Sequence, residues 1–294
     1  MTTPADEFEI HRSRLFGLAY RMLGSAEEAE DTVQDAYLRW SSAGRQDVER
    51  PGAWLAKVVT NLCLTRLTSA RAQREVYPGP WLPEPVVTSD GTLGPLESAE
   101  QRDAVSYALL VLLERLTPAE RAVYVLREAF AYGYREIAEV LDLGEANCRQ
   151  LYRRATQRLS AEGTRFEAEP ERQARLVESF LTAARDGDVA ELEQLLAADV
   201  TWWGDGGGKV SAARRPVEGR ERVLRFVAIG FRRFVAHLGL TVEEVNGAPG
   251  LVARDGDRIV AVLAFEVRAG LVTQMRSVVN PDKLAFVERQ LRRV

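Results

Sequence analysis

A segment rich in proline and glycine divides this chain and limits what it can fold into. Five prolines and three glycines stand between Tyr77 and Pro95. Proline removes a backbone donor and fixes φ, so this many prolines exclude a helix through the segment. We therefore expect an extended linker over residues 76–100, with one domain before it and further domains after it.

The composition is that of a soluble globular protein. The chain has 294 residues, of which 46% are hydrophobic and 28% are charged, which suits one large or two ordinary domains. No apolar run approaches the roughly 20 residues of a membrane span, and the first residues are acidic where a signal peptide is basic. The expected location is therefore cytoplasmic, without membrane contact.

Cysteine and histidine are scarce. Cys63 and Cys148 lie far apart in sequence, and neither His11 nor His237 stands near them. A disulfide framework and a zinc site are not expected from this pattern. We expect neither a cofactor nor a metal.

The first domain, residues 1–75, is expected to be helical. Apolar residues recur at helical spacing on both sides of Gly24-Ser25, which predicts two antiparallel helices. A third helix begins at Pro51, and its far end is polar and basic. The outer face of the second helix is either solvated or docks onto a partner helix. It carries a stripe of acids with a leucine: Asp31, Gln34, Asp35 and Leu38.

The second helical stretch, residues 101–166, is predicted to contain a helix-turn-helix. Thr117-Pro118-Ala119-Glu120 has the residues of a capping box. A short helix over 134–141, a tight turn and a helix over 145–159 follow. The outward face of the last helix carries side chains that can read base edges in the major groove: Asn147, Arg149, Gln150, Arg153, Arg154 and Arg158.

The net charge indicates that any DNA binding is local. Lys+Arg number 39 and Asp+Glu 43, so a formal charge of -4 gives no general attraction to nucleic acid. From Asn147 to Arg165, however, there are five arginines and a single acid, Glu162. A helical hairpin that exposes arginine without touching DNA is the alternative, but the turn, the short scaffold helix and the basic excess favour DNA binding.

The third region, residues 167–294, alternates apolar and polar residues as strands do. Helices are expected at 170–186, 189–197 and 219–234, and strands at 237–246, 251–254, 258–268 and 271–279. This domain is therefore α+β. The whole chain is predicted to be multidomain, with two all-α domains before the α+β domain.

Several segments resemble the extracytoplasmic-function (ECF) sigma factors of bacteria, in that family's order. Asp31-Thr-Val-Gln-Asp-Ala-Tyr-Leu-Arg-Trp40 resembles region 2.2, and Pro51-Gly-Ala-Trp-Leu-Ala-Lys-Val-Val-Thr-Asn61 resembles regions 2.3 and 2.4. Leu116–Glu128 and Tyr134–Leu141 resemble region 4. Trp81–Pro85, Asp205–Lys209 and Asn280–Leu284 resemble the subgroup with a C-terminal SnoaL-like extension, which has the NTF2-like cone fold.

The resemblance implies a sigma factor that binds core RNA polymerase and directs promoter-specific initiation, and not an enzyme. The stripe on the second helix would bind the polymerase, and the recognition helix would bind the double-stranded minus-35 element. The melted minus-ten strand would be held by Trp54, Lys57, Asn61, Arg66 and Arg71. A tryptophan at an apolar helical position usually packs into the core, and that reading of Trp54 is favoured. Glu145 and Cys148 depart from the family pattern of serine or threonine and of a valine-like residue, so the bases read stay open.

For the extension we expect regulation in cis, through a contact with the linker that sets the spacing of the two DNA-binding domains. The spacing of the glycines in this contact does not match a phosphate loop. They either let the backbone approach the linker or form a permissive turn. The residues are Trp81, Pro83, Glu84, Asp205, Gly206, Gly207, Gly208, Lys209, Asn280, Pro281, Asp282 and Lys283.

Two other functions stay open on the sequence. One is a stand-alone helix-turn-helix regulator with a small-molecule ligand in its C-terminal domain. The other, less favoured, is a fused SnoaL-type enzyme with Asp205 or Glu266 as its base. His237 is the one histidine in that region, and no acid/base pair emerges.

Overall fold

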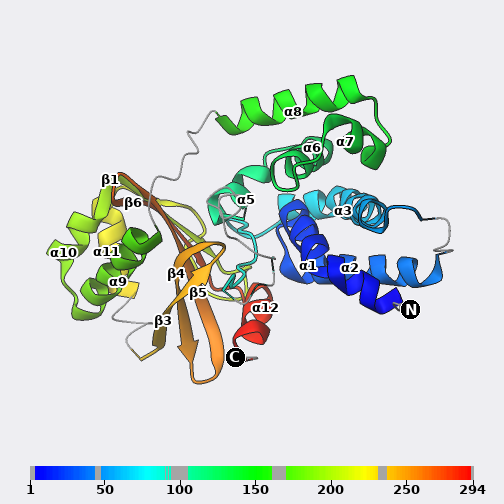
Figure 1. Cartoon of the computed structure of the whole chain (residues 1–294). Coiled ribbons are helices and arrows are strands. Elements are labelled where there is room, and N and C mark those ends of the chain that lie inside the picture. Colours follow the sequence, from blue (N-terminus) through cyan, green and yellow to red (C-terminus); the bar gives the residue numbers. More distant parts are fainter. Residues whose placement is uncertain are drawn as a thin grey trace. The chain divides into compact units, whose positions relative to one another are not determined.

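The chain forms two compact units in a computed structural model (Figure 1). The helical unit comprises Met1–Glu75, Gly91–Val105 and Leu109–Thr164, and the sheet unit comprises Val76–Asp90, Ser106–Ala108 and Arg165–Val294. The structure describes residues 4–43, 48–89, 91, 93, 105–160, 170–230 and 237–292. Within these, no helix is long and apolar enough to cross a membrane.

Three long helices open the helical unit: α1 (Pro4–Leu23), α2 (Ala26–Ser42) and α3 (Pro51–Glu75). Gly24 adopts a φ of 68°, and Ser25 caps α2 by accepting a hydrogen bond from the backbone N–H of Glu28, so the chain turns sharply between the first two helices. Trp40 and Leu55 are among the large side chains buried where the three helices meet. This confirms the helical prediction for the first part of the chain.

The described residues that follow in the chain form four shorter helices, of which α5 begins in the sheet unit: α5 (Tyr107–Leu113), α6 (Pro118–Glu128), α7 (Tyr134–Leu141) and α8 (Glu145–Ser160). The capping box at Thr117 and Glu120 is formed as predicted. Asp142 ends α7 in the left-handed region, with a φ of 53°, and lets α8 start three residues later. The helix-turn-helix is therefore present, with Cys148, Leu151, Ala155 and Leu159 on its buried side.

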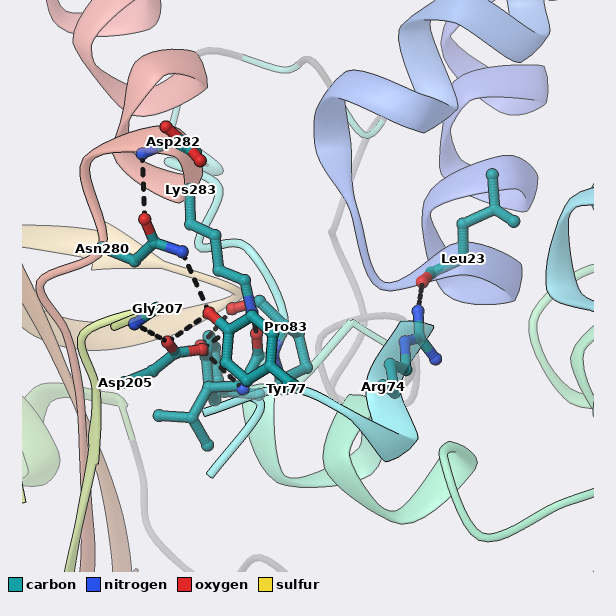
Figure 2. Close-up of polar contacts among 11 residues, drawn as sticks. Leu23, Arg74, Tyr77, Pro83, Asp205, Gly207, Asn280, Asp282 and Lys283 are labelled. Carbon is teal, nitrogen blue, oxygen red and sulfur yellow. Dashed lines mark hydrogen bonds and ion pairs between the residues drawn. The ribbon is translucent and has the colours of Figure 1, made fainter. Parts of the chain in front are cut away.

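Buried charges join the early and late helices of this unit. Arg121 is 2% exposed and donates to the carbonyl of Met22 (2.8 Å) and to the carboxylate of Glu114 (2.8 Å). Arg74, near the end of α3, also pairs with Glu114 and donates to the carbonyl of Leu23 (2.6 Å; Figure 2). The carbonyls at the end of α1 thus receive cations, which the helix dipole favours.

The sheet unit is built on one sheet of six strands in the order β2-β1-β6-β5-β4-β3. Its strands are β1 (Leu196–Asp205), β2 (Val217–Glu218), β3 (Gly239–Val245), β4 (Ala248–Asp255), β5 (Arg258–Arg268) and β6 (Leu271–Val278). Its helices are α9 (Pro170–Asp186), α10 (Val189–Leu195), α11 (Arg220–Gly230) and α12 (Pro281–Arg292). The α+β prediction is confirmed.

The sheet is covered on both faces. Helices α9, α10 and α11 pack on one face around an apolar core that includes Phe180, Phe265 and Met275, whereas α12 packs against β5 on the other face (Figure 1). The rings of Phe180 and Phe265 meet edge to face, with centroids 5.2 Å apart. Because α12 lies directly after β6, it places residues 280–283 beside the end of β1, where Asp205 stands.

The sequence-based boundaries agree with the structure at α9 and β5 and differ elsewhere. The predicted helix over 189–197 ends at Leu195, because the chain passes directly into β1. β1 and β2 were not predicted, and β4 is longer than the expected 251–254. The part of the expected helix beyond residue 230 lies outside the described residues.

Candidate functional site

The linker between the two helical stretches lies in the sheet unit. Val87 forms an antiparallel bridge with Val245 at the end of β3. The backbone N–H of Thr88 donates to the carbonyl of Glu244, and that of Asn246 donates to the carbonyl of Val86, both at 2.9 Å. β3 is the edge strand of the sheet, so the linker extends the sheet by a short pairing.

The carboxylate of Asp205 is the centre of the contact between linker and sheet. It is 1% exposed and accepts hydrogen bonds from the Tyr77 hydroxyl (2.6 Å), the Leu82 backbone N–H (2.9 Å) and the Gly207 backbone N–H (3.0 Å). The ammonium of Lys283 is 2.7 Å from the same carboxylate. Figure 2 shows these side chains pointing toward one another. Two of the four donors come from the linker, so removing the linker would leave this buried charge with half of its hydrogen bonds.

Lys283 is held by the linker as well as by Asp205. Its Nζ donates to the carbonyl of Leu82 and lies 4.1 Å from the ring centroid of Trp81 and 4.8 Å from that of Tyr77. An ammonium over two aromatic faces with a carboxylate beside it is strongly attracted to that position. Burial and the hydrogen bond to Asp205 raise the pKa of Tyr77 well above its usual value, so its phenol stays protonated.

The three glycines after Asp205 combine a turn with a close approach. Gly207 and Gly208 have φ values of 59° and 73°. A Cβ on Gly207 would lie 2.3 Å from Asn280 Nδ2, and one on Gly208 would lie 2.9 Å from Pro78 Cγ. The glycines therefore have both of the structural roles that the sequence suggested: they form a permissive turn, and they let the backbone approach the linker.

The remaining residues of the expected contact surround this centre. Asn280 Nδ2 donates to the Tyr77 hydroxyl (2.9 Å), and Pro281 opens α12. Lys209 and Asp282 form an exposed ion pair of 2.6 Å. The carbonyl of Pro83 accepts from the hydroxyl of Tyr107. Gly206 is buried and has no room for a Cβ beside the Val210 carbonyl. Glu84 is buried too.

Three residues that the sequence did not single out, Tyr77, Asn246 and Gln290, also take part in the contact between linker and sheet, as does Leu82 of the segment Trp81–Pro85. Tyr77 and Leu82 bind Asp205, Asn246 Oδ1 accepts from the Val86 N–H (3.1 Å), and Gln290 is bonded to both backbone groups of Val87 (3.0 and 2.9 Å). Their partners lie more than 100 residues away in sequence, so no local pattern signals these pairs. The helix that carries Gln290, α12, was itself not predicted from the sequence.

The predicted DNA-binding face of α8 is exposed, but its side chains differ in their partners. Arg149 pairs with Glu145, and Arg158 pairs with Glu120. On this face, Asn147, Gln150, Arg153 and Arg154 make no side-chain hydrogen bond or ion pair with other described residues.

The residues expected to hold the minus-ten strand are partly engaged within the helical unit. Lys57 Nζ donates to the carbonyl of Glu139 (2.9 Å) and to Asp142 Oδ1 (2.6 Å), at the end of α7. Trp54 is half-buried and packs at a tilt on Trp40, with ring centroids 5.6 Å apart. Asn61 is half-buried on α3, and the side chain of Arg71 lies outside the described residues.

The stripe on α2 is oriented as its spacing predicts. Leu38 is 57% exposed, and Asp31 and Gln34 are exposed too. Asp35 pairs with Arg66 at 2.8 Å, so a residue expected to face the polymerase and one expected to face DNA bind each other here.

Both carboxylates that the enzyme hypothesis requires are bound in buried ion pairs. Asp205 pairs with Lys283, and Glu266, 3% exposed, accepts from Arg276 (3.1 Å) and Arg268 (2.6 Å). Burial lowers the pKa of Arg276, and Glu266 opposes that shift. Neither carboxylate is arranged as a general base.

Comparison with known proteins gives matches along the chain. Residues 8–73 match Sigma-70 region 2, residues 106–159 match Sigma-70 region 4, and residues 177–286 match a SnoaL-like domain.

Full-length relatives are similar in sequence and in structure. The chain is 38% identical over 287 residues to the ECF RNA polymerase sigma factor SigJ of Mycobacterium tuberculosis, covering 94% of this chain and 92% of SigJ. It is 31% identical to the probable ECF RNA polymerase sigma factor SigI of the same species, covering 97% and 96% of the two chains. The crystal structure of SigJ superposes with a TM-score of 0.77 at 36% identity, over 96% of this chain and 98% of that one.

Proposed function

This chain belongs to the ECF RNA polymerase sigma factors, with a SnoaL-like domain at its C-terminus, and from that premise we propose that it binds core RNA polymerase, directs initiation at specific promoters, and is regulated in cis by its extension. The α2 stripe binds the polymerase, α3 receives the melted minus-ten strand, and α8 binds the minus-35 element. The extension acts through the linker that joins the first two regions.

The observation that supports regulation in cis is the burial of the linker at Asp205. The linker supplies two donors to this carboxylate, and two aromatic faces to the Lys283 ammonium. Its segment Val86–Thr88 also pairs with the edge strand of the sheet. A linker bound in this way cannot adjust its length freely, so the extension controls how far regions 2 and 4 separate.

Contacts within the helical unit indicate why the separation of regions 2 and 4 needs control. Lys57 on α3 is bound to the end of α7, while the minus-ten and minus-35 elements are separate sites on a promoter. The two regions therefore move apart when both elements are bound. The exposed pair of Lys57 with Asp142 is weak enough to exchange for contacts with DNA, whereas the largely buried pairs of Glu114 with Arg74 and Arg121 must open for the regions to separate.

The test is run-off transcription by the full-length protein with bacterial core RNA polymerase. The templates are a set of promoters, including the DNA upstream of the protein's own gene, with the distance between the two elements varied by one base pair at a time. We expect a specific transcript that is lost in the Arg153→Ala/Arg154→Ala variant.

Asp205→Asn tests the regulatory part in the same assay. We expect it to broaden the range of element spacings that support transcription, while Asp282→Asn, which removes the exposed ion pair beside it, leaves the range unchanged. An identical range in all three proteins would overturn regulation through the linker. Absence of any transcript, together with tight promoter binding by the protein alone, would favour a stand-alone regulator.

A further inference from the structure

Arg149 is held differently from the other arginines on the exposed face of α8. Its guanidinium pairs with the carboxylate of Glu145, one helical turn earlier, and lies 5.4 Å from the ring centroid of Tyr134 on α7. Arg153 and Arg154, in the next turn of α8, make no side-chain hydrogen bond or ion pair among the described residues. Arg149 and Arg158 are thus held, Arg158 by Glu120, whereas Arg153 and Arg154 are not held by any other described side chain.

The tyrosine that holds Arg149 is itself fixed by the scaffold. The Tyr134 ring meets that of Tyr152 edge to face, with centroids 6.0 Å apart, and Arg127 lies 5.0 Å from its centroid. The hydroxyl of Tyr152 donates to Glu128 on α6 at 2.7 Å. The position of Arg149 is therefore set by three helices and not by α8 alone.

Glu145 also changes the charge of this end of the helix. It stands in the first turn and neutralises Arg149 one turn later, whereas Arg153 and Arg154 in the next turn keep their positive charge. A neutralised arginine adds little to the sequence-independent attraction between protein and phosphates. An arginine already oriented, in contrast, loses little freedom when it donates two hydrogen bonds to the O6 and N7 atoms of guanine.

We propose that Glu145 and Tyr134 position Arg149 to read a guanine in the minus-35 element, and that Arg153 and Arg154 supply the affinity for phosphate. This inference rests on the proposed function and deepens it. Glu145 is a positioning residue: it acts on base selectivity through Arg149 and does not itself select the base. Its place at the first position of α8 puts it where recognition helices meet base edges.

The experiment uses full-length protein in holoenzyme with bacterial core polymerase. A template library with a randomised minus-35 element is transcribed, and the transcribed templates are sequenced. Glu145→Gln is compared with Glu139→Gln, which removes one negative charge from an exposed carboxylate on α7 that pairs with Arg135. We expect Glu145→Gln to lower the preference at one base pair about five-fold, and Glu139→Gln to leave all preferences unchanged.

Salt dependence gives a second readout that a purely structural role would not move. Freed from Glu145, Arg149 can neutralise one more phosphate, so the slope of log affinity against log salt concentration should become steeper by about 0.9 for duplex DNA. In an Arg149→Ala background, Glu145→Gln should change neither the base preference nor this slope.

Three results would overturn the inference: no change in Glu145→Gln, the same change in Glu139→Gln, or an effect of Glu145→Gln that persists without Arg149. The wild-type reaction separates this inference from its premise. If the wild-type holoenzyme transcribes specifically and Glu145→Gln has the same base preference and salt dependence, only the role of Glu145 is refuted. If the wild-type protein supports no transcription, the sigma-factor proposal is refuted and this inference with it.

Discussion

Two lysine–aspartate pairs in the sheet unit show that the contribution of an ion pair to stability depends on how far the pair is buried. Lys283 and Asp205 are both almost fully buried, whereas the side chains of Lys209 and Asp282 are 54% and 63% exposed. The two pairs have similar N–O distances of 2.7 and 2.6 Å. Distance alone therefore says nothing about their contributions to stability.

We predict that Asp205→Asn lowers the free energy of unfolding of the sheet unit by about 3 kcal/mol, because it leaves the Lys283 ammonium buried without a counter-charge. Asp282→Asn is the matched control and should cost at most about 0.5 kcal/mol, since water solvates both partners. Urea denaturation followed by tryptophan fluorescence measures both. Equal effects of the two substitutions would contradict the assignment of Asp205 as the centre of the contact.

Tyr77 gives the contact a dependence on high pH. Its pKa is raised in the folded protein, so the folded state retains the phenolic proton to a higher pH than the unfolded state does. The stabilisation is complete below the ordinary tyrosine pKa of about 10 and is lost as the pH rises above that value. We predict that Tyr77→Phe is less stable than wild type at pH 8 and that the difference shrinks above pH 10. Denaturation at a series of pH values checks this, and a difference that is constant from pH 8 to 11 would contradict it.

At the scale of elements, Glu114 joins the two helical stretches. It lies just after α5 and receives Arg74 from α3 and Arg121 from α6, while both arginines also bind carbonyls at the end of α1. Burial lowers the pKa of Arg121 to about 9, which records the cost of keeping this cation out of water. One carboxylate thus compensates two poorly solvated cations.

We predict that Glu114→Gln destabilises the helical unit by about 3 kcal/mol, because both arginines lose their counter-charge at once. Glu139→Gln, in an exposed pair with Arg135, should change stability by no more than about 0.5 kcal/mol. Thermal and urea unfolding monitored by circular dichroism measure the two variants. A Glu114→Gln variant as stable as Glu139→Gln would mean that the arginines are adequately held by the carbonyls alone.

Helices and strands with turn or capping residues at their ends could be predicted from the sequence, and those without such residues could not. The bounds of β5 are as expected because turns flank it on both sides, at Gly256 and at Ala269-Gly270. β1 was not predicted because it follows α10 with no turn residue between them, so the helical pattern runs into the strand. The exposed face of α8 follows from helical periodicity alone. The contact at Asp205 was expected only from a family resemblance, and Tyr77 and Gln290 escaped because their partners are remote in sequence.

At the scale of the whole molecule, the linker is a part of the sheet unit. Its backbone N–H groups donate to four acceptors spread over the C-terminal region: Asp205 receives from Leu82, Asn246 from Val86, Gln290 from Val87 and Glu244 from Thr88. Leu82, Val86 and Val87 are each no more than 2% exposed. The linker should therefore open as one cooperative segment.

Hydrogen exchange tests this cooperativity in the full-length protein. We predict slow exchange at all four amides in the wild type, and a parallel loss of protection at all four in Asp205→Asn, although only Leu82 donates to Asp205 itself. Mass spectrometry of peptides that cover residues 77–89 gives the measurement. Faster exchange at Leu82 with unchanged protection at Val86–Thr88 would show that the two halves of the linker are independent.

The distance in sequence between the linker and its partners has a consequence for synthesis of the chain. Val87 and Gln290 are 203 residues apart, so at about 5–20 residues per second the linker leaves the ribosome about 10–40 s before its last partner. Region 4 is completed within that interval, while the segment between regions 2 and 4 is still uncovered. The nascent chain thus passes through a state in which the sigma regions are folded and the extension cannot yet hold them, and the synthesis of α12 ends that state.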